Sequence, residues 1–165
     1  MTADDDVAFA VADPASGEVQ AALRRYLAEI AERIPHGNTG PDDAGAVDEY
    51  APPSGVFLLA RGRQAVVGCG AIRALGPALG EVKRMWIDPA WRGRGLGGRL
   101  LDALEDAARD LGYDRLRLDT HELLVEAIGL YEAHGYRRID RYHDYPDPTH
   151  FYEKRLVGPG GPLPA

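Results

Sequence analysis

The stretch that most constrains the fold runs from Glu81 to Gly98. Its first seven residues, Glu81 to Ile87, predict a strand, and the leucine-rich run that follows the stretch predicts a helix. Between them lies a turn rich in glycine and flanked by arginine. Such a unit directs backbone N–H groups and the positive end of the helix dipole at one place, so it favours a phosphate ligand.

Two well-known phosphate-binding loops can be compared with this turn. It has no Gly-Lys-Ser/Thr sequence, so a nucleoside-triphosphate loop is excluded. A dinucleotide loop fits the glycine spacing of Gly93–Gly98, and Asp114 and Asp119 lie near the distance of a ribose-binding acid. However, five residues including Pro89 separate the strand from the first glycine, and the chain that follows is too short for a doubly wound sheet.

Two segments of the chain together resemble one family. The segment Arg92–Gly97 resembles the Gln/Arg-x-x-Gly-x-Gly/Ala signature of the GNAT superfamily of acetyltransferases, whose turn binds the pyrophosphate of acetyl-CoA. Ala127–Tyr136 is similar to the family's Ala-Ile-x-Leu-Tyr-x-x-x-Gly-Phe/Tyr segment, and the likeness extends from about Val56 to Leu156. It implies an α/β (α+β) fold with a mixed, mostly antiparallel central sheet, a parallel strand pair at the CoA site, and flanking helices.

Composition limits the other possibilities. A chain of 165 residues suits one domain, which we expect over residues 1–157, with a disordered Gly/Pro tail at 158–165. The net charge of −7 argues against non-specific nucleic-acid binding, and the single cysteine, Cys69, suits a reducing compartment. Apolar runs are too short for a membrane span, and the acidic start is unlike a signal peptide, so we expect a cytoplasmic protein.

Hydrophobic periodicity predicts the remaining elements. The expected helices cover residues 16–34, 96–111 and 124–134, and the expected strands cover residues 7–13, 56–60, 64–72, 81–87, 114–119, 136–142 and 151–156. Because a helix separates strands 81–87 and 114–119, we expect them to be parallel with a right-handed crossover. The Gly-, Pro- and acid-rich segment 36–55 is either a solvated loop or a lid that attracts a cationic substrate.

The resemblance implies which residues bind the cofactor. The backbone of Gly93–Gly98 would hold the pyrophosphate, with Arg92 and Arg94 either adding charge or remaining solvated. The pantetheine arm would pair like a further strand with the backbone at the end of the preceding strand, and the N–H of Met85 would face the thioester carbonyl. The expected cofactor-binding residues are Met85, Trp86, Ile87, Arg92, Gly93, Arg94, Gly95, Leu96, Gly97 and Gly98.

Two catalytic residues are predicted on the same basis. Tyr131 matches the family's tyrosine acid for the leaving thiolate, and the alternative is a core tyrosine. Glu81 matches a strand carboxylate that accepts the amine proton, and the alternative is a salt bridge with Lys83 or Arg84. One position departs from the family, because Leu124 stands where an asparagine often contacts the pantetheine arm.

Other catalytic chemistries receive little support. The histidines have no metal-ligand spacing, so no metal is expected. His121 follows a strand that points at the site and is a candidate substrate contact, whereas the other histidines are expected at the surface. Cys69 is expected to be a core residue rather than an acyl carrier.

The sequence therefore predicts an N-acetyltransferase. An amine would attack acetyl-CoA directly in a ternary complex, and the alternative is a non-catalytic CoA-binding or regulatory module on the same scaffold. The expected partner is a small-molecule or peptide amine acceptor, with neither nucleic acid nor membrane, and a homodimer remains an open alternative. Polyamines, aminoglycosides, amino acids, peptide N-termini and lysine are all compatible acceptors.

Overall fold

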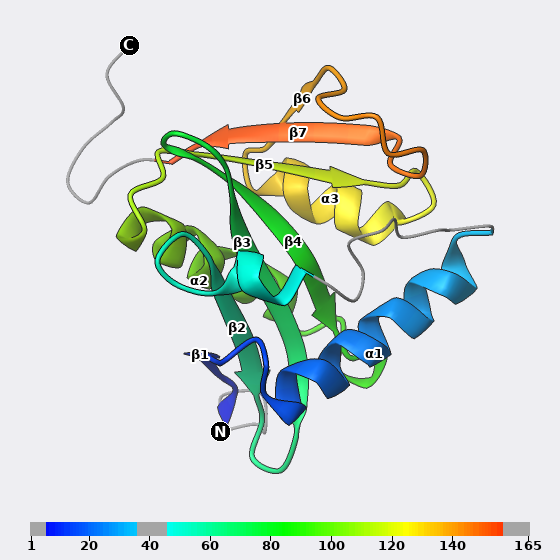
Figure 1. Cartoon of the computed structure of the whole chain (residues 1–165). Coiled ribbons are helices and arrows are strands. Elements are labelled where there is room, and N and C mark those ends of the chain that lie inside the picture. Colours follow the sequence, from blue (N-terminus) through cyan, green and yellow to red (C-terminus); the bar gives the residue numbers. More distant parts are fainter. Residues whose placement is uncertain (1–5, 36–45, 157–165) are drawn as a thin grey trace.

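A computed structural model describes residues 6–35 and 46–156. These residues form one seven-stranded sheet with helices on both faces (Figure 1). The strands lie in the order β1-β2-β3-β4-β5-β7-β6. The strands are β1 (Ala8–Val11), β2 (Val56–Arg61), β3 (Val66–Gly76), β4 (Leu79–Ile87), β5 (Arg115–Thr120), β6 (Arg137–Ile139) and β7 (His150–Arg155). The α-helices are α1 (Gly17–Arg33), α2 (Leu96–Asp110) and α3 (Val125–Ala133), with short 3-10 helices at Ala46–Tyr50 and Pro89–Trp91.

One pair of neighbouring strands in this sheet, β4 and β5, is parallel, and the other neighbours are antiparallel. This confirms the predicted mixed, mostly antiparallel sheet. The parallel pairing is short, since it joins only Leu79–Glu81 to Arg115–Arg117. Beyond this point β4 and β5 diverge, as Figure 1 shows, so among the described residues the edge of β4 that faces β5 has no strand partner from Val82 onward.

A bulge in β4 accompanies the divergence. The β3–β4 register shifts between Cys69 and Ala71, and Arg84 on the opposite strand adopts a φ of 57°. The buried thiol of Cys69 donates to the carbonyl of Arg84 at 3.2 Å and so supports the bulged backbone. A side chain at Gly68 would place its Cβ 2.7 Å from the carbonyl oxygen of Trp86. Glycine at this position therefore allows the two strands to approach closely.

Two hydrophobic cores lie on opposite faces of the sheet. The α1 face contains Phe57, Leu59 and Trp86 of the sheet, packed with Val19 and Leu23. The other face packs against α2 and α3, and its members include Leu58, Val82, Leu100, Leu104, Leu118 and Tyr131. Because β2 is buried on both faces, its sequence is a continuous apolar run rather than an alternating one.

The helix ends follow local signals in the sequence. Ser16 caps α1 by accepting a hydrogen bond from the N–H of Val19 at 3.3 Å. Gly112 and Gly135 follow the ends of α2 and α3 with φ values of 94° and 87°, as expected for glycine after a helix C-terminus.

Several predicted strand boundaries differ from the structure. Strand β3 continues to Gly76, and strand β4 already begins at Leu79. Both are longer than predicted because a tight turn, with Ala78 at a φ of 57°, joins them. Strand β6 covers only three residues, Arg137–Ile139, rather than 136–142. After Ile139 the chain leaves the sheet and forms a loop. Arg141 stabilises this loop by donating hydrogen bonds to the carbonyls of Tyr145 and Pro148, both at 3.0 Å.

Parts of three sequence predictions lie outside the described residues. These are the tail at 158–165, the first half of the proposed lid at 36–45, and the ends of the single domain predicted over 1–157. In the described second half of the lid segment, Tyr50 is buried and packs edge-to-face on Phe57, with ring centroids 6.0 Å apart. Among the described helices, none combines the length and apolar character that crossing a membrane requires.

Candidate active site

A cavity of about 430 Å³ lies where β4 and β5 diverge. Its walls come from α1, β4, the glycine turn, the start of α2, the end of β5, α3 and the β6–β7 loop. The predicted residues that line it are Met85, Trp86, Ile87, Arg92, Gly93, Gly95, Leu96, Gly97, Gly98 and Tyr131. Two predicted site residues, Arg94 and Glu81, are absent from this lining.

The glycines of the turn serve two different purposes. Gly93 and Gly95 have φ values of 79° and 78°, and a Cβ on either would meet nothing within 4 Å. These two positions therefore require glycine for the backbone conformation and leave the space above the backbone open. At Gly97 and Gly98, by contrast, a Cβ would lie 3.2 Å from Leu130 and 3.0 Å from His134, respectively. Glycine at these two positions therefore allows α3 to pack closely against α2.

Tyr131 on α3 directs its hydroxyl at the bulge of β4. The side chain is buried, and its hydroxyl lies 4.0 Å from the sulfur of Met85. Burial raises the pKa of Tyr131, and the nearby Tyr26 and Asp119 raise it further. The phenol therefore keeps its proton at neutral pH, which is the state that a general acid needs.

The two arginines of the turn both contact other protein groups. Arg92 donates to the carbonyl of Ile87 at 2.9 Å and to the carboxylate of Glu29 on α1 at 2.7 Å. Arg94 stacks on the ring of Trp91 at 4.9 Å. Partial burial opposes ionisation of Glu29, but hydrogen bonds from Arg92 and Trp86 outweigh it and lower the pKa of that carboxyl. A direct phosphate contact of either arginine stays a prediction.

Glu81 is fully buried, with 0% of its side chain exposed. Its Oε1 accepts from Nε of Arg73 at 2.7 Å, and its Oε2 accepts from the hydroxyl of Tyr142 at 2.5 Å. The ion-pair partner differs from the Lys83 or Arg84 considered from the sequence. The physical reason is cross-strand register, since Arg73 lies directly opposite Glu81 in the β3–β4 pair.

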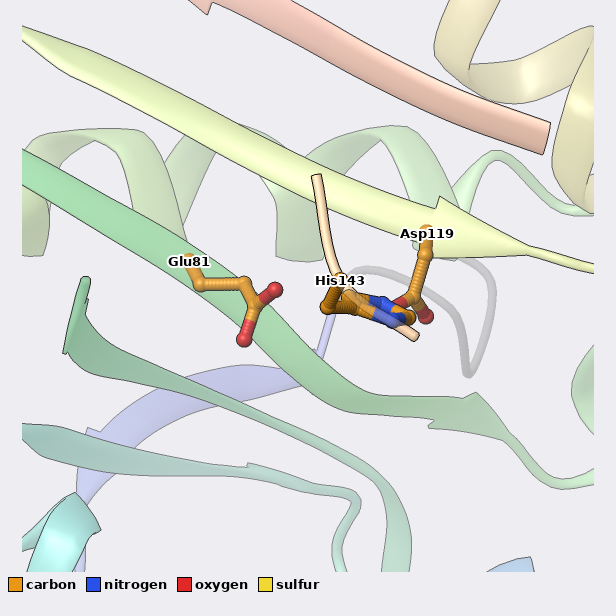
Figure 2. A group of neighbouring side chains, drawn as sticks. All are labelled: Glu81, Asp119 and His143. Carbon is orange, nitrogen blue, oxygen red and sulfur yellow. The ribbon is translucent and has the colours of Figure 1, made fainter. Parts of the chain in front are cut away.

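Sequence reasoning missed a hydrogen-bonded pair beside Glu81, formed by Asp119 and His143 (Figure 2). Nε2 of His143 lies 2.5 Å from Oδ2 of Asp119. Asp119 is at the end of β5 and lines the cavity, whereas His143 belongs to the β6–β7 loop. His143 was expected at the surface, but its side chain is only 15% exposed.

Ligand atoms of Glu81, Asp119 and His143 lie within 4.8 Å of one another, a spacing that a metal ion can use. Their hydrogen bonds, however, describe a network of protein groups. Both carboxylate oxygens of Glu81 accept hydrogen bonds, and both ring nitrogens of His143 have partners. The expected absence of a metal stays a prediction.

The two remaining side chains singled out from the sequence are placed as follows. His121 lines the cavity, and its Nδ1 accepts from the N–H of Leu123 at 3.0 Å. Cys69 is a fully buried core residue, as predicted, and burial raises the pKa of its thiol to about 12. A thiol that is buried and protonated is a poor acyl acceptor.

Comparisons with known proteins agree with this geometry. Residues 22–136 match the acetyltransferase (GNAT) family. The chain is 42% identical over 109 residues to an IAA acetyltransferase of Azospirillum brasilense, with 64% of this chain and 71% of that protein covered.

Solved structures of acyltransferases have a similar fold. An acyl-CoA N-acyltransferase structure from Klebsiella pneumoniae has 33% identity and a TM-score of 0.73, covering 92% of this chain and 98% of that one. An acetyltransferase of Salmonella typhimurium, solved with its cofactor acetyl-CoA, has a TM-score of 0.68 and covers 97% of this chain and 99% of that one. At 18% identity, the latter likeness concerns the fold alone. The family match covers more than half of the chain, and the chain therefore belongs to the GNAT family of acetyltransferases.

Proposed function

We propose that this acetyltransferase transfers an acetyl group from acetyl-CoA to a primary amine by direct attack in a ternary complex. One observation carries the proposal. The unpaired edge of β4, the glycine turn and the hydroxyl-bearing face of Tyr131 all border the same cavity. A strand edge, an anion-binding turn and a protonated phenol are the three parts needed to hold an acyl thioester and protonate its leaving group.

The residues present fit acetyl-CoA. The open space above Gly93 and Gly95 admits a phosphate against the backbone at the start of α2, where the helix dipole favours negative charge. The backbone of β4 from Val82 to Ile87 offers groups that no neighbouring strand on the β5 side uses. When bound, acetyl-CoA supplies the activated acetyl group as a thioester.

Tyr131 supplies the proton for the departing thiolate. Its burial against α2 and the sheet fixes the ring, and ring contacts with Tyr136 and Tyr152, with centroids 6.0 and 6.4 Å away, restrict it further. A fixed, protonated phenol at the β4 bulge is suited to general acid catalysis. Leu124 is at the N-cap of α3, and its side chain makes no capping hydrogen bond. The hydrogen bond that the family's asparagine often makes to the pantetheine arm would therefore be lost or replaced.

The role of Glu81 as the base stays a prediction from the sequence. Both of its oxygens are bonded and it is absent from the cavity lining, so a proton would reach it only through the hydroxyl of Tyr142, which is absent from that lining as well. Burial and the neighbouring carboxylates of Glu81 and Asp119 raise the pKa of Tyr142, so this hydroxyl stays protonated and can only relay a proton.

Release of free thiol from acetyl-CoA tests the proposal. The protein is mixed with acetyl-CoA and a panel of primary amines, and the N-acetyl product is identified by mass spectrometry. We expect thiol release that depends on the amine and equals the amide formed. If the protein binds acetyl-CoA but no amine increases thiol release, the non-catalytic CoA-binding alternative is favoured instead.

A further inference from the structure

Asp119 presents one free oxygen at the cavity. Its Oδ2 is held by His143, whereas no hydrogen bond or ion pair among the described residues uses Oδ1, and this oxygen is not one of the fully buried polar atoms. The side chain is 13% exposed and lines the cavity. A carboxylate with one oxygen fixed and the other open to a cavity is ready to accept a hydrogen bond from a ligand.

His143 is held in a single orientation. Its Nδ1 accepts from the N–H of Tyr145 at 3.2 Å, which assigns the ring proton to Nε2 and makes that nitrogen the donor to Asp119. The ring also packs against Phe151, with centroids 5.0 Å apart. Arg141 binds three carbonyls of the same loop and keeps its shape. His143 therefore orients Asp119 rather than contacting a ligand itself.

One oxygen of a second carboxylate in the same cavity wall lacks a hydrogen-bond partner. Among the described residues, Oδ2 of Asp147 is the one buried side-chain oxygen or nitrogen without a hydrogen bond. Asp147 lines the cavity, and the loop that carries it is joined to the end of β5 by a hydrogen bond from the N–H of Thr149 to the carbonyl of Thr120 at 3.0 Å. A buried carboxylate oxygen without a donor is costly, so a ligand that brings N–H donors is favoured there.

The charge of Asp119 affects the pKa values of two tyrosines that line the cavity. After burial, which is the main cause, Asp119 contributes to the raised pKa of Tyr131 and to that of Tyr26, which is raised to about 12. Tyr26 comes from α1 and Tyr131 from α3, and both line the same cavity as Asp119. The other titratable groups close to it are Glu81 of β4 and Tyr142 and His143 of the loop, and Lys83 and Arg84 of β4 line the same cavity.

We infer that Asp119, oriented by His143, and Asp147 together bind the ammonium group of a cationic acceptor amine, and that Asp119 accepts the proton which that group loses. This inference rests on the proposed function and names its substrate class. An alkylammonium ion has three N–H donors, so one such group is able to donate to more than one carboxylate oxygen. Asp119 thus takes the direct role for which the sequence proposed Glu81, and Glu81 anchors Tyr142.

The proton balance of the reaction follows. One ammonium proton passes to Oδ1 of Asp119, and the freed lone pair of the nitrogen forms the N–C bond to the acetyl carbon. The C–S bond breaks, and the sulfur takes the hydroxyl proton of Tyr131. The second proton that the nitrogen loses returns to Tyr131 through solvent, and the proton on Asp119 leaves to bulk solvent. The net result is an amide, a free thiol and one proton.

Steady-state kinetics with two acceptors tests this site. The acceptors are 1,4-diaminobutane, which is cationic, and glutamate, which carries a net negative charge. We expect kcat/KM for the diamine to exceed that for glutamate at least about tenfold, because glutamate brings negative charge to Asp119 and Asp147. Asp119→Asn should lower kcat/KM for the diamine by about 100-fold or more. Asp147→Asn should raise KM about tenfold with little change in kcat, since it removes binding alone.

Two further variants separate positioning from structure. His143→Phe should lower kcat about tenfold, and His143→Gln, which keeps an N–H donor at the Nε2 position, should restore most of it. Asp144→Asn is the matched control, since Asp144 is an exposed carboxylate of the same loop. It should leave kcat and KM unchanged.

Each outcome bears on a different claim. A preference for glutamate, or an Asp119→Asn variant that keeps the wild-type kcat/KM while folded by circular dichroism, would overturn the cationic-acceptor site but not acetyl transfer. If the protein binds acetyl-CoA by calorimetry and acetylates neither acceptor nor any other amine of the panel, the proposed function fails, and the site falls with it.

Discussion

The cofactor end and the acceptor end of the cavity present their functional groups in different ways. At the proposed cofactor end, formed by β4 from Val82 to Ile87 and the glycine turn, the proposed binding groups are backbone atoms placed by a strand, a bulge and a helix start. At the acceptor end, formed by Asp119, His143 and Asp147, they are side chains from β5 and the β6–β7 loop. The first is determined by local sequence, and the second exists only after distant segments meet.

This difference has a functional meaning. A backbone site tolerates substitution of most side chains, so one cosubstrate can be kept while the acceptor end changes. The acceptor end depends on single side chains and on a loop clamped by Arg141. Tyr131 lies between the two ends, since it approaches Met85 on one side and is influenced by Asp119 on the other.

The largest expected effect comes from Tyr131, where the two ends meet. Tyr131→Phe keeps the ring and its packing but removes the proton, so kcat should fall about 100-fold or more. The affinity for acetyl-CoA, measured by calorimetry, and the melting temperature should change little. An unchanged rate, under conditions where the chemical step limits turnover, would show that Tyr131 is only a core residue.

Glu81→Gln tests whether Glu81 belongs to the acceptor end or only stabilises the fold. The change weakens the bond to Arg73 in a fully buried position, so stability should fall by about 1–3 kcal/mol, a drop of several degrees in melting temperature. With Asp119 as the proton acceptor, the shape of the pH–rate profile should be retained.

The opposite result for this variant would support Glu81 as the base. In that case the rate loss would be largest near neutral pH and would shrink as pH rises and the amine loses its proton unaided. Thermal unfolding and a pH–rate series on the one variant distinguish the two roles.

Gly95→Val tests whether the cofactor end depends on the backbone. A φ of 78° disfavours valine, and its side chain would fill the open space above the turn, so affinity for CoA should fall about tenfold or more. Gly129→Ala is the matched control, because a Cβ at Gly129 also meets nothing within 4 Å while its φ is outside the left-handed range. Wild-type CoA affinity in Gly95→Val would show that the phosphates bind elsewhere.

The smallest expected effect is at the start of α3. Leu124 occupies the N-cap and makes no side-chain hydrogen bond, so Leu124→Asn should stabilise the helix by about 1 kcal/mol, or a few degrees in melting temperature. Leu123→Asn, at an exposed neighbouring position, is the control and should not do so. A loss of stability in Leu124→Asn would show that the packing of leucine outweighs the missing cap.

The sequence predicted the strand, turn and helix of the proposed cofactor end well because their signals are local. The Gly93–Gly98 turn, the stripe of α2 and the glycines that end α2 and α3 each depend on neighbours a few residues away. The parallel pairing of β4 with β5 followed from the intervening helix. How early β5 separates from β4 did not follow, because that depends on the bulge and on packing across the sheet.

The acceptor end could not be predicted in the same way. The contact between Asp119 and His143 joins residues 24 positions apart, and that between Glu81 and Tyr142 joins residues 61 positions apart. No periodic pattern marks a loop histidine as a partner of a strand aspartate. The alternation of β5 does place Arg117 and Asp119 on one face, opposite the buried Leu116 and Leu118, which is the single signal that could have directed attention to Asp119.

Initial-rate kinetics with both substrates varied tests most directly whether the two ends act together. If the acceptor amine and acetyl-CoA occupy the cavity at the same time, double-reciprocal plots against 1,4-diaminobutane at several acetyl-CoA concentrations should intersect. The buried thiol of Cys69, with its pKa raised to about 12, agrees with this expectation, since it offers no route to an acyl-enzyme. Parallel lines, with a covalent acetyl-enzyme detected by mass spectrometry in the absence of amine, would contradict the account.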